Sequence, residues 1–228
     1  MYIPGDPTRA RQSTPMNNDG LTIVKRNLAQ HVSEEDTYTP TRYARFLSYL
    51  GPETIHLLDV GCNTGRGGTI MKARRPDLRI TGLDCVSERL SKLDRTAYEE
   101  SVCAFSHDIP LAAGRFDAIV AGEFIEHVAP PYVFPTLCEF FRLLRLRGRL
   151  LLTTPNPKYI RNRLLGRSVL LEASHVSQHL PSSLRRRLED VGFSSVKIYG
   201  CGRVSSLIGP HFPLRSLYGS YLVVAEKW

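Results

Sequence analysis

The sequence lacks any apolar run long enough to cross a membrane. A membrane-spanning helix needs about 20 predominantly apolar residues, and no stretch of this 228-residue chain approaches that length. The N-terminus also lacks the apolar segment of a secretory signal peptide, because Pro4, Asp6, Pro7 and Arg9 stand where that segment would lie. We therefore expect neither a membrane span nor a secretory signal.

Cysteine is scarce, and its spacing forms no CxxC pair. The five cysteines are Cys62, Cys85, Cys103, Cys138 and Cys201. An odd and scattered set predicts neither a zinc knuckle nor a disulfide framework. It fits a reducing compartment, so we expect a cytoplasmic location.

Acidic residues are fewer than basic ones, 22 against 30, which gives a formal net charge of +8. Such an excess favours anionic partners but does not determine the fold. We do not expect nucleic acid as a partner, because the basic runs carry no interleaved aromatic residues and no RNA-binding domain is appended. The hydrophobic content of 42% and the length are those of one ordinary globular domain.

The first 50 residues are expected to form an arm and lid helices ahead of the main domain, residues 51–228. Residues 1–20 are rich in Pro, Asn, Asp and Ser and show no period, which is typical of a mobile arm. Helical patterning begins near Leu21 and again at Thr39-Pro40, a capping residue followed by a proline at the first helical position, and Gly51 would end this helix. We expect this region to fold over a bound cofactor or acceptor.

From residue 54 onwards strands and helices alternate. Apolar runs predict strands at 55–60, 78–84, 116–121, 149–154, 194–199 and 221–226, with one more short strand before Asp108. Helical stretches lie between them at 67–75, 87–99, 131–146 and 181–191. This alternation predicts an α/β fold with a largely parallel sheet covered by helices on both faces. The loop between the last two strands favours a hairpin at the sheet edge.

A glycine-rich turn, Asp59 to Gly68 (DVGCNTGRGG), follows the first strand and precedes a helix. Such a turn lets the backbone pass close to a ligand at the carboxyl edge of the sheet. Asp84 ends the second strand, where an acid accepts hydrogen bonds from ribose hydroxyls. Asp108 follows the short third strand and could meet the edge of an adenine ring.

Taken in order, these motifs resemble those of class I methyltransferases, which use S-adenosylmethionine. The series is Asp59-x-Gly61-x-Asn63-x-Gly65, Asp84, His107-Asp108-Ile109, FDAIVAGEFIEHV and LRGRLLLTTPNP, over roughly residues 50–200. The resemblance implies a Rossmann-like sheet of seven strands, mostly parallel with the last strand antiparallel. It also implies cofactor contacts from Asp59, Gly61, Asn63, Gly65, Asp84, Cys85, Asp108 and Ile109.

One position departs from the usual turn, since Asn63 replaces its middle glycine. Asparagine tolerates a positive φ better than other non-glycine residues, so we expect the turn to survive. The alternative is a dehydrogenase-type fold that binds NAD. That fold needs a GxGxxG spacing, which Gly61 to Arg66 does not supply.

A second cluster, Gly122-Glu123-Phe124-Ile125-Glu126-His127, follows the strand at 116–121. If a helix begins there, Glu123, Glu126 and His127 share one face. Together with His175 they resemble the metal site of small-RNA 2′-O-methyltransferases and ubiquinone-pathway O-methyltransferases. The resemblance implies that Glu123, Glu126, His127 and His175 hold a divalent cation, Mg²⁺ or Mn²⁺.

The same residues also allow catalysis without a metal. In that alternative Glu126 caps a helix, and His127 or His175 acts as the general base. His127, His175 and Glu126 are therefore the catalytic candidates in both interpretations. We interpret His179 as a surface residue.

The predicted activity is O-methylation of a small-molecule hydroxyl. A divalent metal would chelate two neighbouring oxygens of the acceptor and lower the pKa of the hydroxyl to be methylated. We favour a saccharide acceptor, because sugars offer vicinal hydroxyls and sugar-tailoring methyltransferases share this one-domain layout. The alternatives are a catechol or quinol, the 2′-hydroxyl of an RNA terminus, and a non-catalytic cofactor-binding subunit. The connection 155–180 is predicted to be a substrate lid with solvated charges.

Overall fold

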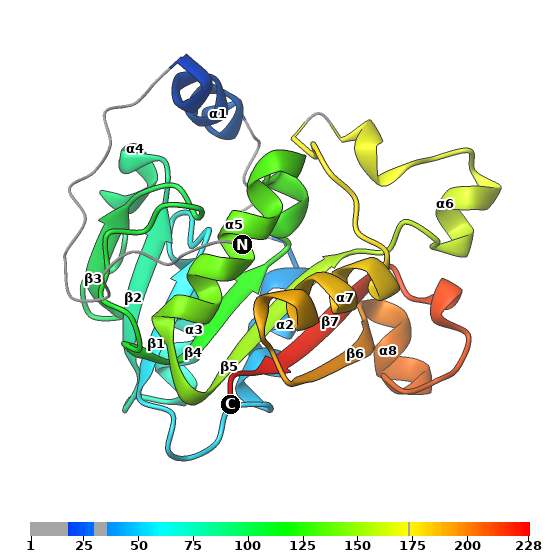
Figure 1. The fold of residues 1–228 in the computed structure, drawn as a ribbon. Coiled ribbons are helices and arrows are strands. Elements are labelled where there is room, and N and C mark those ends of the chain that lie inside the picture. The colour runs from blue at the N-terminus through cyan, green and yellow to red at the C-terminus, as the bar shows by residue number, and fades with distance from the viewer. Residues whose placement is uncertain (1–17, 30–35, 173) are drawn as a thin grey trace.

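The computed structural model describes residues 18–29, 36–172 and 174–228. A seven-stranded sheet in the order β3-β2-β1-β4-β5-β7-β6 runs through the molecule, with helices on both faces (Figure 1). The strands are β1 (His56–Val60), β2 (Arg79–Asp84), β3 (Tyr98–Cys103), β4 (Phe116–Gly122), β5 (Leu144–Pro155), β6 (Ser195–Cys201) and β7 (Ser220–Glu226). The expected mobile arm at 1–20 lies mostly outside the described residues.

The sheet is mostly parallel, as the sequence predicts. β1 pairs in parallel with β2 and β4, β2 with β3, and β4 with β5, whereas β7 runs antiparallel between β5 and β6. β6 and β7 therefore pair at one edge as expected, but their connection contains a short helix, Arg203–Ile208, and a 3₁₀ turn, Arg215–Leu217, rather than the expected loop alone. The seven-stranded Rossmann-like architecture with an antiparallel last strand is confirmed.

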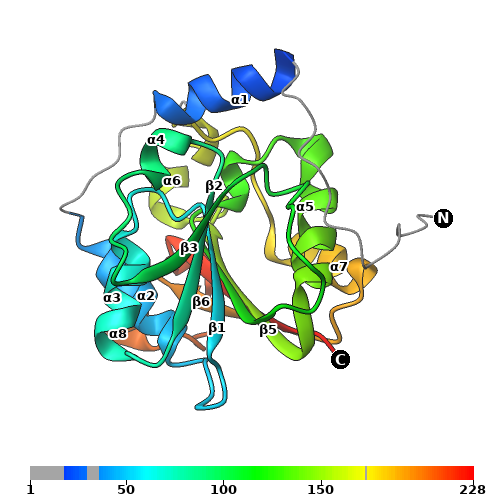
Figure 2. The same ribbon diagram turned by 90° about the vertical axis from the view of Figure 1, so that its left-hand side faces the viewer.

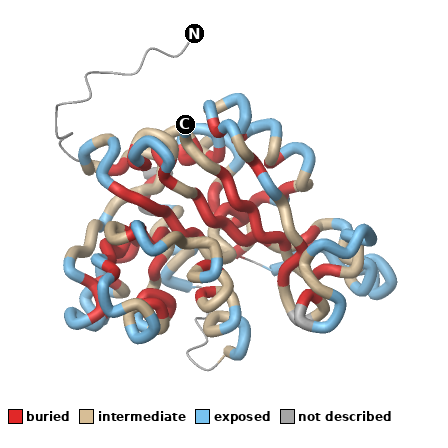
Figure 3. The backbone as a smooth tube through the Cα atoms, turned by 90° about the horizontal axis from the view of Figure 1, so that it is seen from below, coloured by how far each residue is buried: buried red, intermediate tan, exposed pale blue. Residues whose placement is uncertain are grey.

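Two hydrophobic layers hold the helices to the sheet. Side chains alternate along a strand, so Leu57 and Leu58 of β1 face opposite layers and both are fully buried. Figure 2 shows helices on either side of the sheet, and Figure 3 shows the buried strands at its centre. The helices are α1 (Asn18–Leu28), α2 (Tyr38–Leu47), α3 (Arg66–Arg74), α4 (Ser87–Leu90), α5 (Pro130–Leu143), α6 (Ile160–Leu164), α7 (Pro181–Val191) and α8 (Arg203–Ile208), with 3₁₀ turns η1 (Ile125–His127), η2 (Val169–Leu171) and η3 (Arg215–Leu217).

Two of the expected helices are wrong in extent. The stretch 87–99 is helical only over the four residues of α4, because the Asp94 side chain accepts hydrogen bonds from Thr96 N at 2.9 Å and Thr96 Oγ1 at 2.7 Å and holds a turn. The chain then enters β3 at Tyr98, which is fully buried. The helix expected at 131–146 ends at Leu143, after which the chain enters β5.

Helix α2 belongs to the main domain, so residue 50 is not a structural boundary. Its Tyr43 and Phe46 are buried in the same hydrophobic cluster as Leu57. The helix begins at Tyr38, two residues earlier than the expected first position at Pro40, because the Asp36 side chain accepts hydrogen bonds from the backbone N–H groups of Tyr38 and Thr39, both at 2.7 Å. None of the described helices combines the length and apolar character needed to cross a bilayer.

Candidate active site

A cavity of about 720 Å³ opens at the carboxyl ends of the central strands. Gly61 lines it after β1, Asp84 at the end of β2, and Gly122 at the end of β4. β1 lies between β2 and β4, so the strand order reverses at this point. Open α/β sheets bind their ligands in such a crevice. Ile23 of α1 and Tyr43 of α2 also line the cavity.

The glycine-rich turn bends in the left-handed region at three positions. Gly61, Asn63 and Gly65 have φ angles of 65°, 54° and 90°, so asparagine does maintain the turn at position 63. A Cβ atom at Gly61 would lie 2.6 Å from the Phe124 ring, so a side chain has no room there. Gly61, Asn63 and Cys85 line the cavity as expected, whereas Gly65 caps α3 and is not among the lining residues.

Asp84 occupies the position expected for the ribose acceptor. It lines the cavity and is held by backbone hydrogen bonds from Asn63 N and Val86 N, both at 3.0 Å. Burial raises the pKa of this carboxyl, and the two N–H donors oppose that shift. The turn and the carboxylate are therefore fixed relative to each other before any ligand binds.

Asp59 is not among the cavity-lining residues, so its expected contact with the cofactor stays a prediction. It is fully buried, and its two oxygens accept hydrogen bonds from Tyr43 Oη at 2.9 Å and Tyr98 Oη at 2.6 Å. Tyr98 Oη in turn accepts a hydrogen bond from Gly68 N at 2.9 Å. Burial raises the pKa of Asp59 to about 6. This network, which holds the glycine-rich turn against the sheet, could not be predicted from sequence patterns alone.

The segment after the third strand presents aromatic side chains to the cavity, and the expected contact of Asp108 and Ile109 with the cofactor stays a prediction. Ile109 is fully buried and donates its backbone N–H to Glu139 Oε2 at 3.1 Å, and neither Asp108 nor Ile109 is among the cavity-lining residues. Phe105, His107 and Tyr132 line the cavity instead. The rings of His107 and Tyr132 stack with centroids 4.2 Å apart.

Glu123 does not share a helical face with Glu126 and His127, because the turn η1 begins only at Ile125. Glu123 has a φ of 50°, and its backbone N–H lies 3.0 Å from both O and Oγ1 of Thr153 in β5. These bonds keep Glu123 beside the sheet. It lines the cavity, and Ser220 Oγ lies 3.4 Å from its Oε2.

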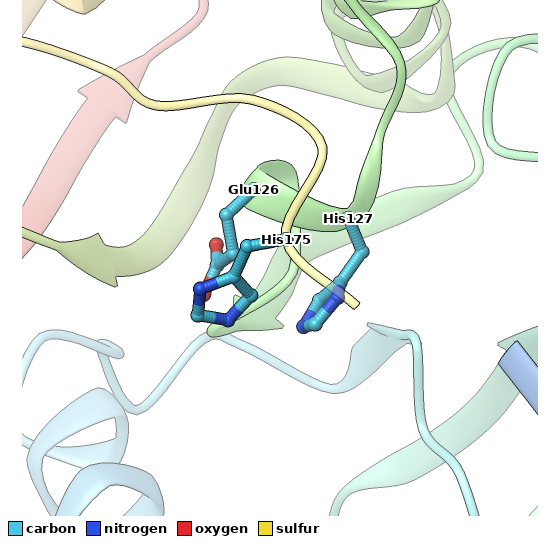
Figure 4. A group of neighbouring side chains, drawn as sticks. All are labelled: Glu126, His127 and His175. Carbon is cyan, nitrogen blue, oxygen red and sulfur yellow. The ribbon is translucent and has the colours of Figure 1, made fainter. Parts of the chain in front are cut away.

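Glu126, His127 and His175 converge, as Figure 4 shows, with one ligand atom of each within 4.8 Å of the others. Glu126 is fully buried, and Thr154 Oγ1 donates to its Oε2 at 3.0 Å. Among the described residues its Oε1 has no hydrogen-bond partner. Burial raises the pKa of this carboxyl well above its usual range, and the charge of Glu123 raises it further.

Both histidines are oriented by backbone carbonyl groups. His127 Nδ1 lies 3.0 Å from Ser174 O, and His175 Nδ1 lies 2.8 Å from Val169 O. A carbonyl oxygen only accepts hydrogen bonds, so each Nδ1 carries the proton and each Nε2 keeps its lone pair when the ring is neutral. Burial lowers the pKa of His127, which favours its neutral form.

His179 is a core residue, so its interpretation as a surface histidine is wrong. Its side chain is only 3% exposed, and its Nε2 lies 2.9 Å from Ser177 Oγ and 3.3 Å from Ile125 O. Burial lowers its pKa to about 4. It ties the segment after His175 to η1 and takes no part in the cavity lining.

Residues 35–198 match the family model described as "Methyltransferase domain", and the chain belongs to this family. It is 28% identical to the malonyl-[acyl-carrier protein] O-methyltransferase of Laribacter hongkongensis over 61% of this chain and 50% of that protein, and so spans about half of that relative. It is 29% identical to the ubiquinone biosynthesis O-methyltransferase of Psychrobacter arcticus over 75% of this chain and 71% of that protein.

The fold is shared with solved methyltransferases. A SAM-dependent methyltransferase from Archaeoglobus fulgidus superposes with a TM-score of 0.66 at 18% identity, over 92% of this chain and 100% of that chain. Family and fold together identify a class I S-adenosylmethionine-dependent methyltransferase, an enzyme. The family match sets aside the NAD-binding alternative.

Proposed function

We propose that the protein transfers the methyl group of S-adenosylmethionine to a hydroxyl oxygen of a small molecule, with a divalent cation held by Glu126, His127 and His175. The observation that carries this proposal is the buried Oε1 of Glu126, which lacks a hydrogen-bond partner among the described residues. Buried polar atoms are rarely left unsatisfied, and an ion is one explanation when they are. The two imidazoles beside it supply further ligand atoms.

The cofactor would lie across the glycine-rich turn. Asp84 is positioned to accept hydrogen bonds from the ribose hydroxyls. Gly61 and Asn63 would flank the methionine part, and Asn63 Oδ1 is a buried acceptor without a partner among the described residues. The adenine would lie near Phe105 and His107, which line the cavity.

The three cluster residues fit a divalent cation. Each histidine has its Nδ1 on a backbone carbonyl, as metal-binding histidines commonly do. His175 Nε2 lies 3.4 Å from Glu172 Oε2, so a bound cation would compete with that contact. Mixed nitrogen and oxygen donors favour Mn²⁺ or a similar ion over Mg²⁺, which prefers oxygen ligands. Such an ion would lower the pKa of the acceptor hydroxyl. Glu123 lies outside the cluster and would act through its charge.

A second candidate mechanism needs no metal. Burial favours the neutral form of His127, and its Nε2 lone pair would accept the hydroxyl proton directly. The side chain is already oriented by Ser174 O, so no rearrangement is required. The two mechanisms share their residues and differ in their response to chelation.

For the acceptor we favour a catechol or quinol over the saccharide expected from the sequence. The similarity to a ubiquinone biosynthesis O-methyltransferase supports this class. A saccharide would still supply the two neighbouring oxygens that a cation binds.

The test is methyl transfer from labelled S-adenosylmethionine to a catechol, a quinol and a saccharide, with EDTA-treated enzyme and with Mn²⁺ or Mg²⁺ restored. We expect activity on the aromatic acceptors, its loss in EDTA and its return with metal. Glu126→Gln and His175→Ala should lose activity while cofactor affinity, measured by calorimetry, stays near that of the wild type. His211→Ala, at an exposed histidine, is the matched control.

Full activity in EDTA, with a pH profile governed by one histidine, would contradict the metal and favour the general base. Transfer to the saccharide alone would contradict the aromatic acceptor. A failure of all three acceptors with intact cofactor binding would contradict O-methylation of small vicinal diols.

A further inference from the structure

Two surface segments carry most of the large exposed apolar side chains of the described residues. One is residues 160–171, which contains α6 and η2, and the other is residues 207–214, between the end of α8 and η3. Leu164, Leu171 and Leu207 are 80%, 69% and 85% exposed. We call these two segments together the apolar rim.

The two segments of the rim lie at the same end of the molecule. α6 packs against η3, which directly follows the second segment. Figure 1 shows α6 and α8 at the same end of the molecule, with the chain around α6 extending away from the sheet. Single exposed leucines are ordinary on a protein surface, but a group of them at one end of a molecule indicates an interaction site.

The charges within the two segments are basic, although an exposed acidic residue, Glu172, directly follows the first segment. Lys158, Arg161, Arg163 and Arg167 are exposed, and no Asp or Glu occurs between positions 156 and 171. The second segment lies between Arg203 and Arg215 and is equally free of acidic residues. Basic side chains beside exposed leucines complement an anionic lipid surface, which attracts the cations while the apolar side chains enter the headgroup boundary.

The rim also adjoins the active-site cavity. Asn162, Ser168 and Val169 belong to the first segment and line that cavity. A molecule held at a bilayer surface would therefore meet the cavity next to the segment that contacts the lipid. We propose that the apolar rim is a peripheral binding surface for anionic lipid membranes. This inference is independent of the metal and of the acceptor named above.

The test is cosedimentation of the full-length protein with vesicles of phosphatidylcholine alone and of phosphatidylcholine with phosphatidylglycerol. We expect binding to the anionic vesicles that weakens as salt is raised. The double variant Leu164→Glu/Leu171→Glu should weaken binding roughly tenfold or more, because each buried leucine contributes a large transfer free energy. Leu146→Glu, at a leucine that is 69% exposed in β5, is the matched control and should bind as the wild type does.

A second pair of variants tests the charges. Arg161→Gln/Arg163→Gln should weaken binding by about fivefold for each charge removed, whereas Arg186→Gln/Arg187→Gln on α7 lowers the net charge equally and should have a smaller effect. Retained folding is checked by thermal melting. No binding to anionic vesicles, or binding that the rim variants leave unchanged, would overturn the proposal. Self-association that the leucine variants abolish, without vesicle binding, would assign the rim to a second copy of the chain instead.

Discussion

Two aspartates at the ends of neighbouring strands have different environments. Asp84 lines the cavity, whereas Asp59 is enclosed by two tyrosine hydroxyls. We expect Asp84→Ala to weaken S-adenosylmethionine binding at least tenfold, because a hydrogen bond to a charged group is worth roughly 1.5–3 kcal/mol. Calorimetric titration measures this, and an unchanged affinity would contradict the assignment.

Tyr43 is a positioning residue that connects α2 to the cofactor turn through Asp59. Tyr43→Phe leaves one oxygen of a buried carboxyl without a partner, so we expect it to lower the free energy of unfolding by about 1–3 kcal/mol and to raise the KM for the cofactor more than it lowers kcat. Denaturant unfolding and steady-state kinetics measure the two effects. In the double variant Tyr43→Phe/Asp59→Asn the two losses should be less than additive, and strict additivity would contradict a direct coupling.

His179 gives the stability a defined pH dependence. Its pKa is about 4 in the folded protein and about 6.5 in the unfolded chain, so protonation favours the unfolded state. Its contribution is complete above pH 6.5 and is lost as the pH falls towards 4, by about 3 kcal/mol at most. The stability difference between wild type and His179→Gln should shrink over this window in denaturant titrations. A difference that is constant with pH would show that His179 is not held neutral.

At the scale of elements, the sequence predicts those strands and helices that have a clear hydrophobic periodicity. Long apolar runs identified six strands, and the ends of α7 coincide with the predicted ones because Pro181 and Gly192 delimit the helix. Short elements were mispredicted where a side chain takes the backbone hydrogen bonds that a helix would need. Asp94 does this after α4, where it accepts a hydrogen bond from Thr96 N. η1 was missed because Glu123 leaves β4 with a positive φ, which no periodicity reveals.

Helix α1 is expected to close the cofactor cavity. Its Ile23 and Asn27 line the cavity, and the Arg89 side chain of α4 donates a hydrogen bond to Asn27 O. Removal of residues 1–28 should leave the domain folded, because the two hydrophobic clusters contain no residue before Tyr43, and should lower kcat/KM. Arg89→Gln should lower it less. If the truncated enzyme keeps its full kcat/KM, α1 is not a lid.

At the scale of the whole molecule, the candidate site depends on contacts between distant segments, which cannot be predicted from the spacing of residues in the sequence. The ordered motifs placed the cavity at the carboxyl edge, because parallel strands bring their ends together there. His127 was paired with His175 by resemblance. The carbonyl groups of Ser174 and Val169 orient the two imidazole rings. No local sequence pattern predicts these two hydrogen bonds. The environment of the Glu126 carboxyl likewise depends on a distant strand, because Thr154 of β5 donates a hydrogen bond to it.

Because α2, the sheet and the outer helices share two continuous hydrophobic clusters, we expect a single unfolding transition that cofactor binding shifts as a whole. At 100 times its dissociation constant S-adenosylmethionine should add about 2.7 kcal/mol, which for a domain of this size raises Tm by roughly 5–10 °C. Asp84→Ala should lose most of this shift, whereas His175→Ala should keep it, since His175 belongs to the cluster with Glu126 and His127 and not to the cofactor turn. Differential scanning calorimetry measures both. A second transition that the cofactor does not move would show that part of the chain, such as the β6–β7 pair, unfolds independently of the cofactor turn.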